Sequence, residues 1–163
     1  MPILSPAMKR MLDEQRLGFV ATVCPDGTPN LSPKGTTTAW DDDHLVFADI
    51  HSPGTIANLR HNPHIEVNVV DSFARKGYRF KGTAEVLTDG AQYDAIVTFY
   101  HQRGSRAVIH AIVLIQISSA AALISPAYDD GTPETEIQSR WEHHYADLHR
   151  EWTTRSDSDT EAV

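Results

Sequence analysis

Two turn sequences divide the first third of the chain into three strand-like runs. The turn at residues 25–29 reads PDGTP, in which proline presets φ and glycine accepts a positive φ. The second turn contains three consecutive aspartates at residues 41–43. The runs beside these turns are rich in β-branched and aromatic residues, which favour strands. Two hairpins in succession predict an antiparallel meander rather than a parallel sheet.

The rest of the chain adds further strands with short helices between them. Helices are expected to begin at Ser5 and Ser52, each a candidate N-cap followed by proline, and at Asp89. The last strand is apolar enough to be buried on both faces. The expected strands are 19–24, 30–40, 44–50, 64–70, 78–87 and 107–117. Residues 1–125 are therefore predicted to form a mainly β domain, a six-stranded antiparallel barrel with helices on its outside.

A change of composition marks the C-terminal part of the chain. Residues 126–155 are predicted to form a helical extension, because apolar side chains recur there every three or four residues. This stripe consists of Ile137, Trp141, Tyr145, Leu148 and Trp152. It could cover the barrel, pack on a partner or shape a ligand pocket. Residues 156–163 are polar and acidic and are expected to be disordered.

Charge and composition exclude several classes of protein. The chain carries 22 acidic and 14 basic residues, and its net charge of −8 argues against broad nucleic-acid binding. It contains no run of about 18 apolar residues that could span a membrane. The N-terminus does not resemble a secretory signal, and the single Cys24 fits a reducing compartment. A cytoplasmic protein is therefore expected.

Familiar catalytic and nucleotide-binding motifs are missing from the sequence. There is no GxGxxG, no Gly-Lys-Ser/Thr and no GxSxG. The nine histidines form no HExxH pattern, and one cysteine is too few for a usual structural zinc site, so no metal is expected. Cys24 is interpreted as a packed residue, and the aspartates at 41–43 as a solvated turn. No catalytic residue is identified.

The four residues SPKG, at 32–35, interrupt a predicted strand. Proline and glycine weaken a strand interior, and Lys34 stands between them. The helix expected at Ser52 offers N–H groups and a positive dipole end, and Gly54 permits close approach of a ligand. Arg79 and Lys81 share one face of a later strand. These features favour a site for an anion attached to a flat ring. Alternatively, Ser52 is only a cap and residues 36–38 are only a polar strand face.

Three segments together resemble a known family. They are GFVATVCPDGTPNLSPKG at 18–35, HLVFADIHSPGTIANLRHNPHIEVNVV at 44–70 and GYRFKGTAEVLTDGAQYDAI at 77–96. Their order and spacing are similar to the pyridoxamine 5'-phosphate oxidase-like FMN-binding split-barrel family, and closest to its small FMN-binding-protein branch. The resemblance covers residues 5–125. It implies a homodimer that holds FMN between its subunits and performs redox chemistry on a small molecule.

The resemblance also implies which positions bind the cofactor. Residues along the ring and ribityl chain are Ser32, Pro33, Lys34, Gly35 and Thr36, with Ala48 and Asp49 at a nearby strand end. Residues around the phosphate or supporting its loop are Ser52, Gly54, Thr55 and Asn58. Lys81 is expected to contribute from a neighbouring strand, with Arg79 beside it.

Two departures from the family bear on its cofactor and activity. Many members carry a basic residue where Gly54 stands, and the true oxidases carry arginine where Ser32 stands, so Lys34, Arg79 and Lys81 are expected to compensate. Lower FMN affinity, or use of the deazaflavin F420 or haem, are alternatives. The acidic C-terminus lacks the Arg-rich ending of the vitamin-processing oxidase, so that activity is not expected. A flavin-dependent oxidoreductase, a flavin-binding electron carrier and a cofactor-free interaction module remain as alternative functions.

Overall fold

The computed structural model describes the backbone of residues 2–160 and the side chains of residues 2–155. The helices are α1 (Pro6–Gln15), α2 (Pro53–His61), α3 (Ala91–Gln102) and α4 (Glu134–Thr160), with a short 3₁₀ turn at Pro126–Tyr128. The strands are β1 (Gly18–Val23), β2 (Pro29–Lys34), β3 (Thr38–Ala39), β4 (His44–Asp49), β5 (His64–Asp71), β6 (Lys76–Leu87) and β7 (Ala111–Ile124). The chain forms two units, one of residues 2–70 with 77–123 and one of 71–76 with 124–160.

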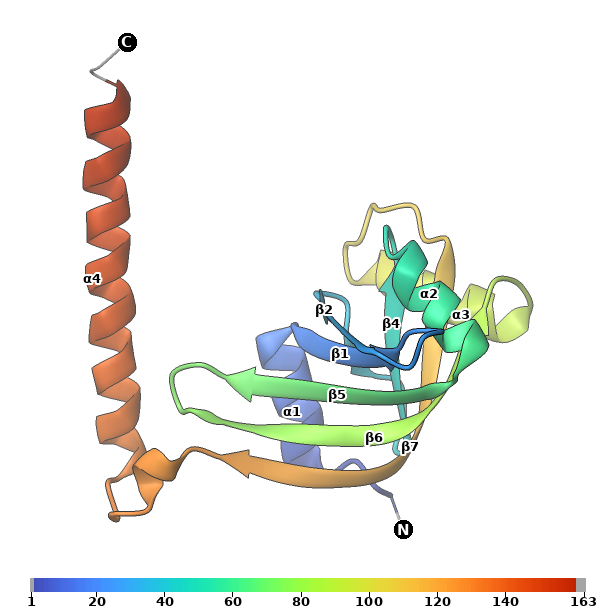
Figure 1. Ribbon diagram of the computed structural model, residues 1–163, viewed down its shortest axis with the longest axis horizontal. Helices are drawn as coiled ribbons and strands as arrows, with labels where there is room; N and C mark the ends of the chain where they lie inside the picture. The colour runs from blue at the N-terminus through green and yellow to red at the C-terminus, as the bar shows by residue number, and fades with distance from the viewer. Residues whose placement is uncertain (1, 161–163) are drawn as a thin grey trace. The chain divides into compact units, whose positions relative to one another are not determined.

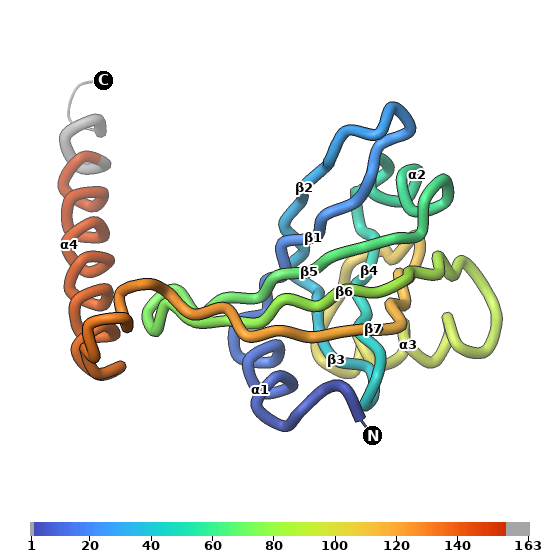
Figure 2. The backbone as a smooth tube through the Cα atoms, turned by 60° about the horizontal axis from the view of Figure 1, so that its bottom comes forward, coloured from blue at the N-terminus to red at the C-terminus, as the bar shows by residue number. Residues whose placement is uncertain are grey.

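The strands of the described chain form one sheet in the order β2-β1-β5-β6-β7-β4-β3 (Figure 1). β1 pairs antiparallel with β2 and β5, and β4 pairs antiparallel with β3 and β7. The sheet curls strongly, as the tube in Figure 2 shows. This is the split β-barrel that the sequence predicts, with seven strands rather than six.

The seventh strand arises because SPKG divides the strand expected at residues 30–40. β2 ends at Lys34, a turn follows, and β3 starts at Thr38. Pro33 is tolerated because β2 is an edge strand, whose outer N–H groups need no partner. In the turn, the hydroxyl of Thr36 donates to the carbonyl of Ala48 (3.3 Å) and accepts from its N–H (2.9 Å). A side chain thus replaces the backbone ladder where the strand breaks.

Both faces of β4 and of the first part of β7, residues 111–115, are covered by apolar residues, as the sequence predicts for the last strand. Leu45 and Phe47 of β4 join one core cluster, while Val46 and Ala48 join the other. α3 covers the second cluster with Ile96 and Tyr100. α1 contacts β3, the strand that leads out of the SPKG turn, and α2 contacts β1, the partner of the strand that leads into it.

Gly82 lies where β6 passes very close to β7. A Cβ atom at this position would stand 2.2 Å from the carbonyl oxygen of Gln116, which is backbone and cannot move without shifting the strand. Gly82, one of three glycines in the family-like segment at 77–96, therefore has a packing reason.

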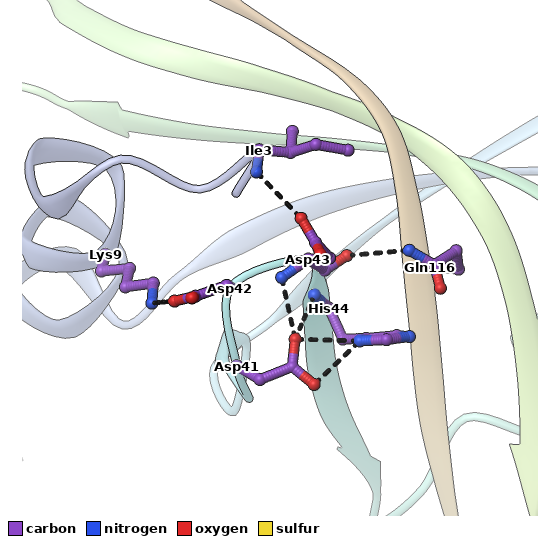
Figure 3. A network of polar contacts seen from close by, with 7 residues as sticks. All are labelled: Ile3, Lys9, Asp41, Asp42, Asp43, His44 and Gln116. Atoms are coloured by element: carbon purple, nitrogen blue, oxygen red, sulfur yellow. Dashed lines mark hydrogen bonds and ion pairs between the residues drawn. The ribbon is translucent and has the colours of Figure 1, made fainter. Parts of the chain in front are cut away.

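The three aspartates at residues 41–43 form a structural turn (Figure 3). The carboxylate of Asp41 accepts from the N–H groups of Asp43 and His44, each over 2.8 Å. Asp43 Oδ1 accepts from the N–H of Ile3 over 2.9 Å, and Asp42 forms an ion pair with Lys9. The acidic cluster thus ties the segment around α1 to the start of β4. This agrees with its interpretation as a turn rather than a catalytic pair.

α1 and α2 begin after Ser5 and Ser52, as the sequence predicts, whereas the expected cap of α3 is not found. Ser5 caps α1, since its hydroxyl accepts from the N–H of Met8 over 3.3 Å. Ser52 precedes α2 but makes no side-chain capping bond. α3 begins at Ala91 after Gly90, which has a positive φ, and no side chain caps it, so the expected role of Asp89 is wrong. In α2 and α3, therefore, no neighbouring side chain accepts a hydrogen bond from the N–H groups of the first turn.

The second unit consists of α4 and the turn between β5 and β6. The guanidinium of Arg75 lies 4.1 Å from the ring centroid of Trp141, and Phe73 contacts Tyr145 edge to face. Part of the predicted aromatic stripe therefore packs on this turn. α4 runs through residues 156–160, where disorder was expected, and residues 161–163 lie outside the described chain. No helix within the described residues is both long and apolar enough to cross a bilayer.

Candidate functional site

Lys34, the last residue of β2, points its charged side chain inward. Its Nζ donates to the hydroxyls of Ser32 and Ser52, each over 2.7 Å, and the residue is only 7% exposed. Ser32 pairs with the fully buried Val20, and Lys34 lies two residues further along β2. The side chains of Ser32 and Lys34 therefore point to the same face of the sheet as Val20. An ammonium is thereby held where the edge strand meets the start of α2.

The surroundings of this ammonium determine its electrostatics. Burial lowers the pKa of Lys34 below its ordinary value, and the nearby carboxylate of Asp49 partly opposes that shift. Asp49 is itself buried, and its Oδ1 accepts from the N–H of Ser52 over 2.7 Å. A charge held away from water interacts more strongly with a counter-charge than an exposed one does. Lys34 is therefore a strong local attractor for an anion, weakened by one neighbouring acid.

The first turn of α2 adds backbone donors beside Lys34. Pro53 has no N–H, and the N–H groups of Gly54 and Thr55 have no acceptor within the helix. Because Ser52 makes no capping bond, its hydroxyl does not occupy them. A Cβ atom on Gly54 would meet nothing within 4 Å, so the helix start has open space beside it. Dipole, N–H groups and ammonium together suit an anion.

Thr55 and Asn58 of α2 are buried, and Asn58 connects the helix to β1. Asn58 Nδ2 donates to the hydroxyl of Thr22 over 3.0 Å and lies 3.6 Å from the sulfur of Cys24. The structure therefore gives Asn58 a supporting position between α2 and β1. Cys24 is a free thiol that packs here, in line with the interpretation from the sequence.

The turn after Lys34 is fixed by a residue that sequence reasoning missed. The hydroxyl of Tyr100, on α3, donates to the carbonyl of Thr36 over 2.7 Å. Burial raises the pKa of Tyr100 well above its ordinary value, so the hydroxyl stays protonated and continues to donate. No signal in the sequence links the two residues, which are 64 positions apart.

Arg79 and Lys81 lie on the opposite face of the sheet from Lys34. Both form ion pairs with Glu66, at 2.8 Å and 3.3 Å. Glu66 pairs with Ala21, and the side chains of Ala21 and its neighbour Val20 point to opposite faces of the sheet. Glu66 therefore lies on the face away from Val20 and Lys34. The expected cluster of three cations is therefore not formed within one chain. The sequence correctly predicts that Arg79 and Lys81 share a face.

A groove lies on this opposite face, which also carries Pro33. It has a volume of about 600 Å³, and its lining includes Ala21, Val23, Glu66, Lys81 and Thr83. Phe19 and Leu31 are exposed, by 39% and 66% respectively. The groove is one of several hollows in the described chain, which also include a smaller cavity beside Gly35 and Thr36. Within the described residues no group of histidine, cysteine or acidic side chains is placed to hold a metal ion.

The fold and this site define a split-barrel protein with a buried cation at a helix start. The family model described as pyridoxamine 5'-phosphate oxidase matches residues 4–124. The chain belongs to this family. HupZ of Group A Streptococcus is 35% identical, with a TM-score of 0.68 over 74% of this chain and 94% of that one. The comparison with curated proteins gave no match.

More distant solved structures share the fold. An FMN-binding protein from Syntrophomonas wolfei subsp. wolfei is 15% identical, with a TM-score of 0.61 over 71% of this chain and 82% of that one. An F420 reductase is 19% identical, with a TM-score of 0.55 over 72% and 98% of the two chains.

Proposed function

We propose that this protein binds FMN and acts as a flavin-dependent oxidoreductase on a small molecule. The observation that carries the proposal is the buried ammonium of Lys34, held by two serine hydroxyls at 2.7 Å beside the uncapped start of α2. Membership of the pyridoxamine 5'-phosphate oxidase family and the fold shared with an FMN-binding protein support it.

The residues present fit a phosphate group. Phosphate oxygens accept hydrogen bonds, and the site supplies an ammonium, hydroxyls and helix N–H groups as donors. Gly54 leaves space at the helix start where a larger side chain would stand. Asp49 opposes a phosphate by its charge, but its Oδ1 is engaged by the N–H of Ser52. Asp49 therefore orders the loop as well as weakening the attraction.

The chain's own groups bind and orient in this proposal. FMN, when bound, supplies hydride and electron transfer. Lys34 and the first turn of α2 hold the phosphate, while backbone N–H groups at residues 35–36 offer preorganised donors to negative charge on the ring. Tyr100 and Ala48 keep that turn in one conformation through their bonds to Thr36. This chemistry needs no protein nucleophile, in keeping with the absence of hydrolase motifs from the sequence.

A homodimer is part of the proposal. The outer face of the sheet exposes Phe19 and Leu31 beside the groove, and contiguous apolar surface of this kind often marks an interface. A second copy covering this face would explain why Arg79 and Lys81 lie there. These two cations would then reach a cofactor bound by the other subunit rather than by their own. A cytoplasmic, reducing location agrees with the free thiol of Cys24.

Absorption spectroscopy with added FMN tests the cofactor, and turnover tests the activity. We expect flavin bands on the purified protein or after titration, and oxidation of NADH or NADPH with an acceptor. Binding of FMN without turnover would favour an electron carrier instead. Binding of F420 or haem in preference to FMN would replace the proposed cofactor. Turnover of pyridoxamine 5'-phosphate would contradict the expectation that this chain is not the vitamin-processing oxidase.

A further inference from the structure

A second cavity lies between the end of α1, the turn after β2 and the end of α3. Its volume is about 230 Å³, and its lining includes Leu12, Arg16, Thr38, Tyr100, Arg103 and Ser105. All of these residues belong to the unit formed by residues 2–70 and 77–123. Its two cations are different from the one that carries the proposed phosphate site.

Arg103 is held in a fixed orientation at this cavity. Its Nη2 lies 3.1 Å from Asp13 Oδ1, and its Nη1 donates to the hydroxyl of Thr38 over 3.4 Å. The guanidinium also stacks over the ring of Phe99, 5.0 Å from the centroid. A guanidinium positioned in this way loses little conformational freedom when a ligand binds.

Arg16 ends α1 and brings a second guanidinium to the same cavity. Its φ of 50° is in the left-handed region, which is uncommon for a residue other than glycine. Its Nε donates to the carbonyl of Asp13 over 3.2 Å. The two terminal nitrogens of Arg16 have no partner among the side chains of residues 2–155. They are donors that a ligand can use.

The balance of charge at the cavity is positive although the protein carries a net charge of −8. Two guanidiniums face one carboxylate, that of Asp13, while Leu12 and Tyr100 give the cavity an apolar, buried wall. The volume is below the roughly 300–1,000 Å³ of common ligand pockets, so only a small molecule fits. We propose that this cavity binds a small organic carboxylate through Arg16 and Arg103, with its apolar body against Leu12 and Tyr100.

The proposal is tested on the full chain without cofactor. Benzoate is the probe, and benzamide, which has the same ring without the charge, is its matched control. Calorimetric titration is expected to show benzoate binding and no benzamide binding. The variants Arg16→Gln and Arg103→Gln are each expected to weaken benzoate binding tenfold or more, because each removes a charge-assisted hydrogen bond worth about 1.5–3 kcal/mol. The matched controls Arg10→Gln and Arg106→Gln, at exposed positions outside the cavity, are expected to bind as the wild type does.

Three results would overturn the proposal. One is no benzoate binding by the wild type, and another is an equal loss in the control variants, which would mean non-specific attraction. The third is displacement of benzoate by FMN, which would make the cavity part of the cofactor site. If Arg103→Gln unfolds, as judged by circular dichroism, the Arg16→Gln variant decides alone. A failure to bind FMN would leave this test unaffected, so the two proposals fail separately.

Discussion

The ammonium of Lys34 and the hydroxyl of Ser52 are joined by a 2.7 Å hydrogen bond across 18 residues of sequence. The bond connects the end of an edge strand to the start of a helix. It explains why Ser52 does not cap α2, because its hydroxyl is turned to the lysine instead. The geometry accounts for a lysine within SPKG as a buried cation rather than a surface residue.

Gly54→Lys is predicted to tighten FMN binding about tenfold or more. The position is exposed, an added side chain meets nothing within 4 Å, and a second cation would stand at the helix start. Fluorescence titration with FMN measures the change. Gly54→Ala is the matched control, because it gives the same gain in helix propensity without the charge. Equal affinities in the two variants would contradict a phosphate at this position.

Asp49→Asn is predicted to tighten FMN binding several-fold at low salt. The substitution removes a negative charge beside the proposed phosphate, while an amide oxygen can still accept from the N–H of Ser52. The gain should shrink as salt is added, since screening weakens charge interactions. Titrations at two salt concentrations measure both effects. Weaker FMN binding by this variant at low salt would show that the carboxylate contributes more than repulsion.

The affinity for FMN is predicted to fall as the pH rises through the pKa of Lys34. Burial holds that pKa below the ordinary 10.5, so the free protein loses this charge at a lower pH than an exposed lysine does. A phosphate beside Lys34 favours the charged form, so binding at alkaline pH requires proton uptake. The same lowered pKa affects stability in the opposite direction, because stability rises as the pH rises. The charged lysine opposes folding at neutral pH, and this cost declines as the pH rises through the lowered pKa toward 10.5.

Titrations at a series of pH values from neutral to alkaline test this prediction. Lys34→Arg serves as the comparison, because a guanidinium stays charged throughout that range. The wild type should lose affinity while the arginine variant changes much less. Parallel pH profiles of the two proteins would rule out Lys34 as the group responsible.

Gly82→Ala is predicted to destabilise the fold by about 1–3 kcal/mol, the range for overpacking in a tightly packed region. A Cβ atom there would lie 2.2 Å from the carbonyl of Gln116, so β6 and β7 must separate locally. Urea denaturation measures the free energy of unfolding. Gly54→Ala is the control and should be neutral or slightly stabilising. A stability of the Gly82 variant equal to that of the wild type would mean that the strands can part without cost.

Local signals in the sequence predicted most of the barrel. The PDGTP turn, the Ser5 cap and the last apolar strand act through neighbouring residues, and each is present in the structure, although the strand expected at 107–117 is found as β7 at Ala111–Ile124. Residues 30–40 were predicted as one strand whose ladder SPKG interrupts, whereas the structure has two strands, β2 and β3, with a turn between them. The bond between Thr36 and Ala48 that stabilises the break comes from a residue 12 positions away.

The candidate site was predictable only in part, for a physical reason. Lys34, Ser32 and Ser52 were singled out because strand breakers and a helix start are visible in the sequence. Arg79 and Lys81 form ion pairs with Glu66, and the face of the sheet that they occupy follows from the pairing of Glu66 with Ala21 of another strand. The sequence of β6 alone does not reveal this pairing. Tyr100 and Arg103 reach their partners from a distant helix, 64 and 90 residues away, so no spacing pattern indicates them.

The most direct test compares the binding of FMN and riboflavin by the wild type and by Lys34→Met. The two ligands differ only in the phosphate, and the variant keeps the length of the side chain without its charge. Fluorescence titration of the wild type should give FMN an advantage over riboflavin of about tenfold to a hundredfold, which corresponds to a charge-assisted hydrogen bond of about 1.5–3 kcal/mol. That advantage should largely disappear in Lys34→Met, with riboflavin binding unchanged. Equal binding of the two ligands by the wild type, or an undiminished preference for FMN in a folded Lys34→Met variant, would contradict the account.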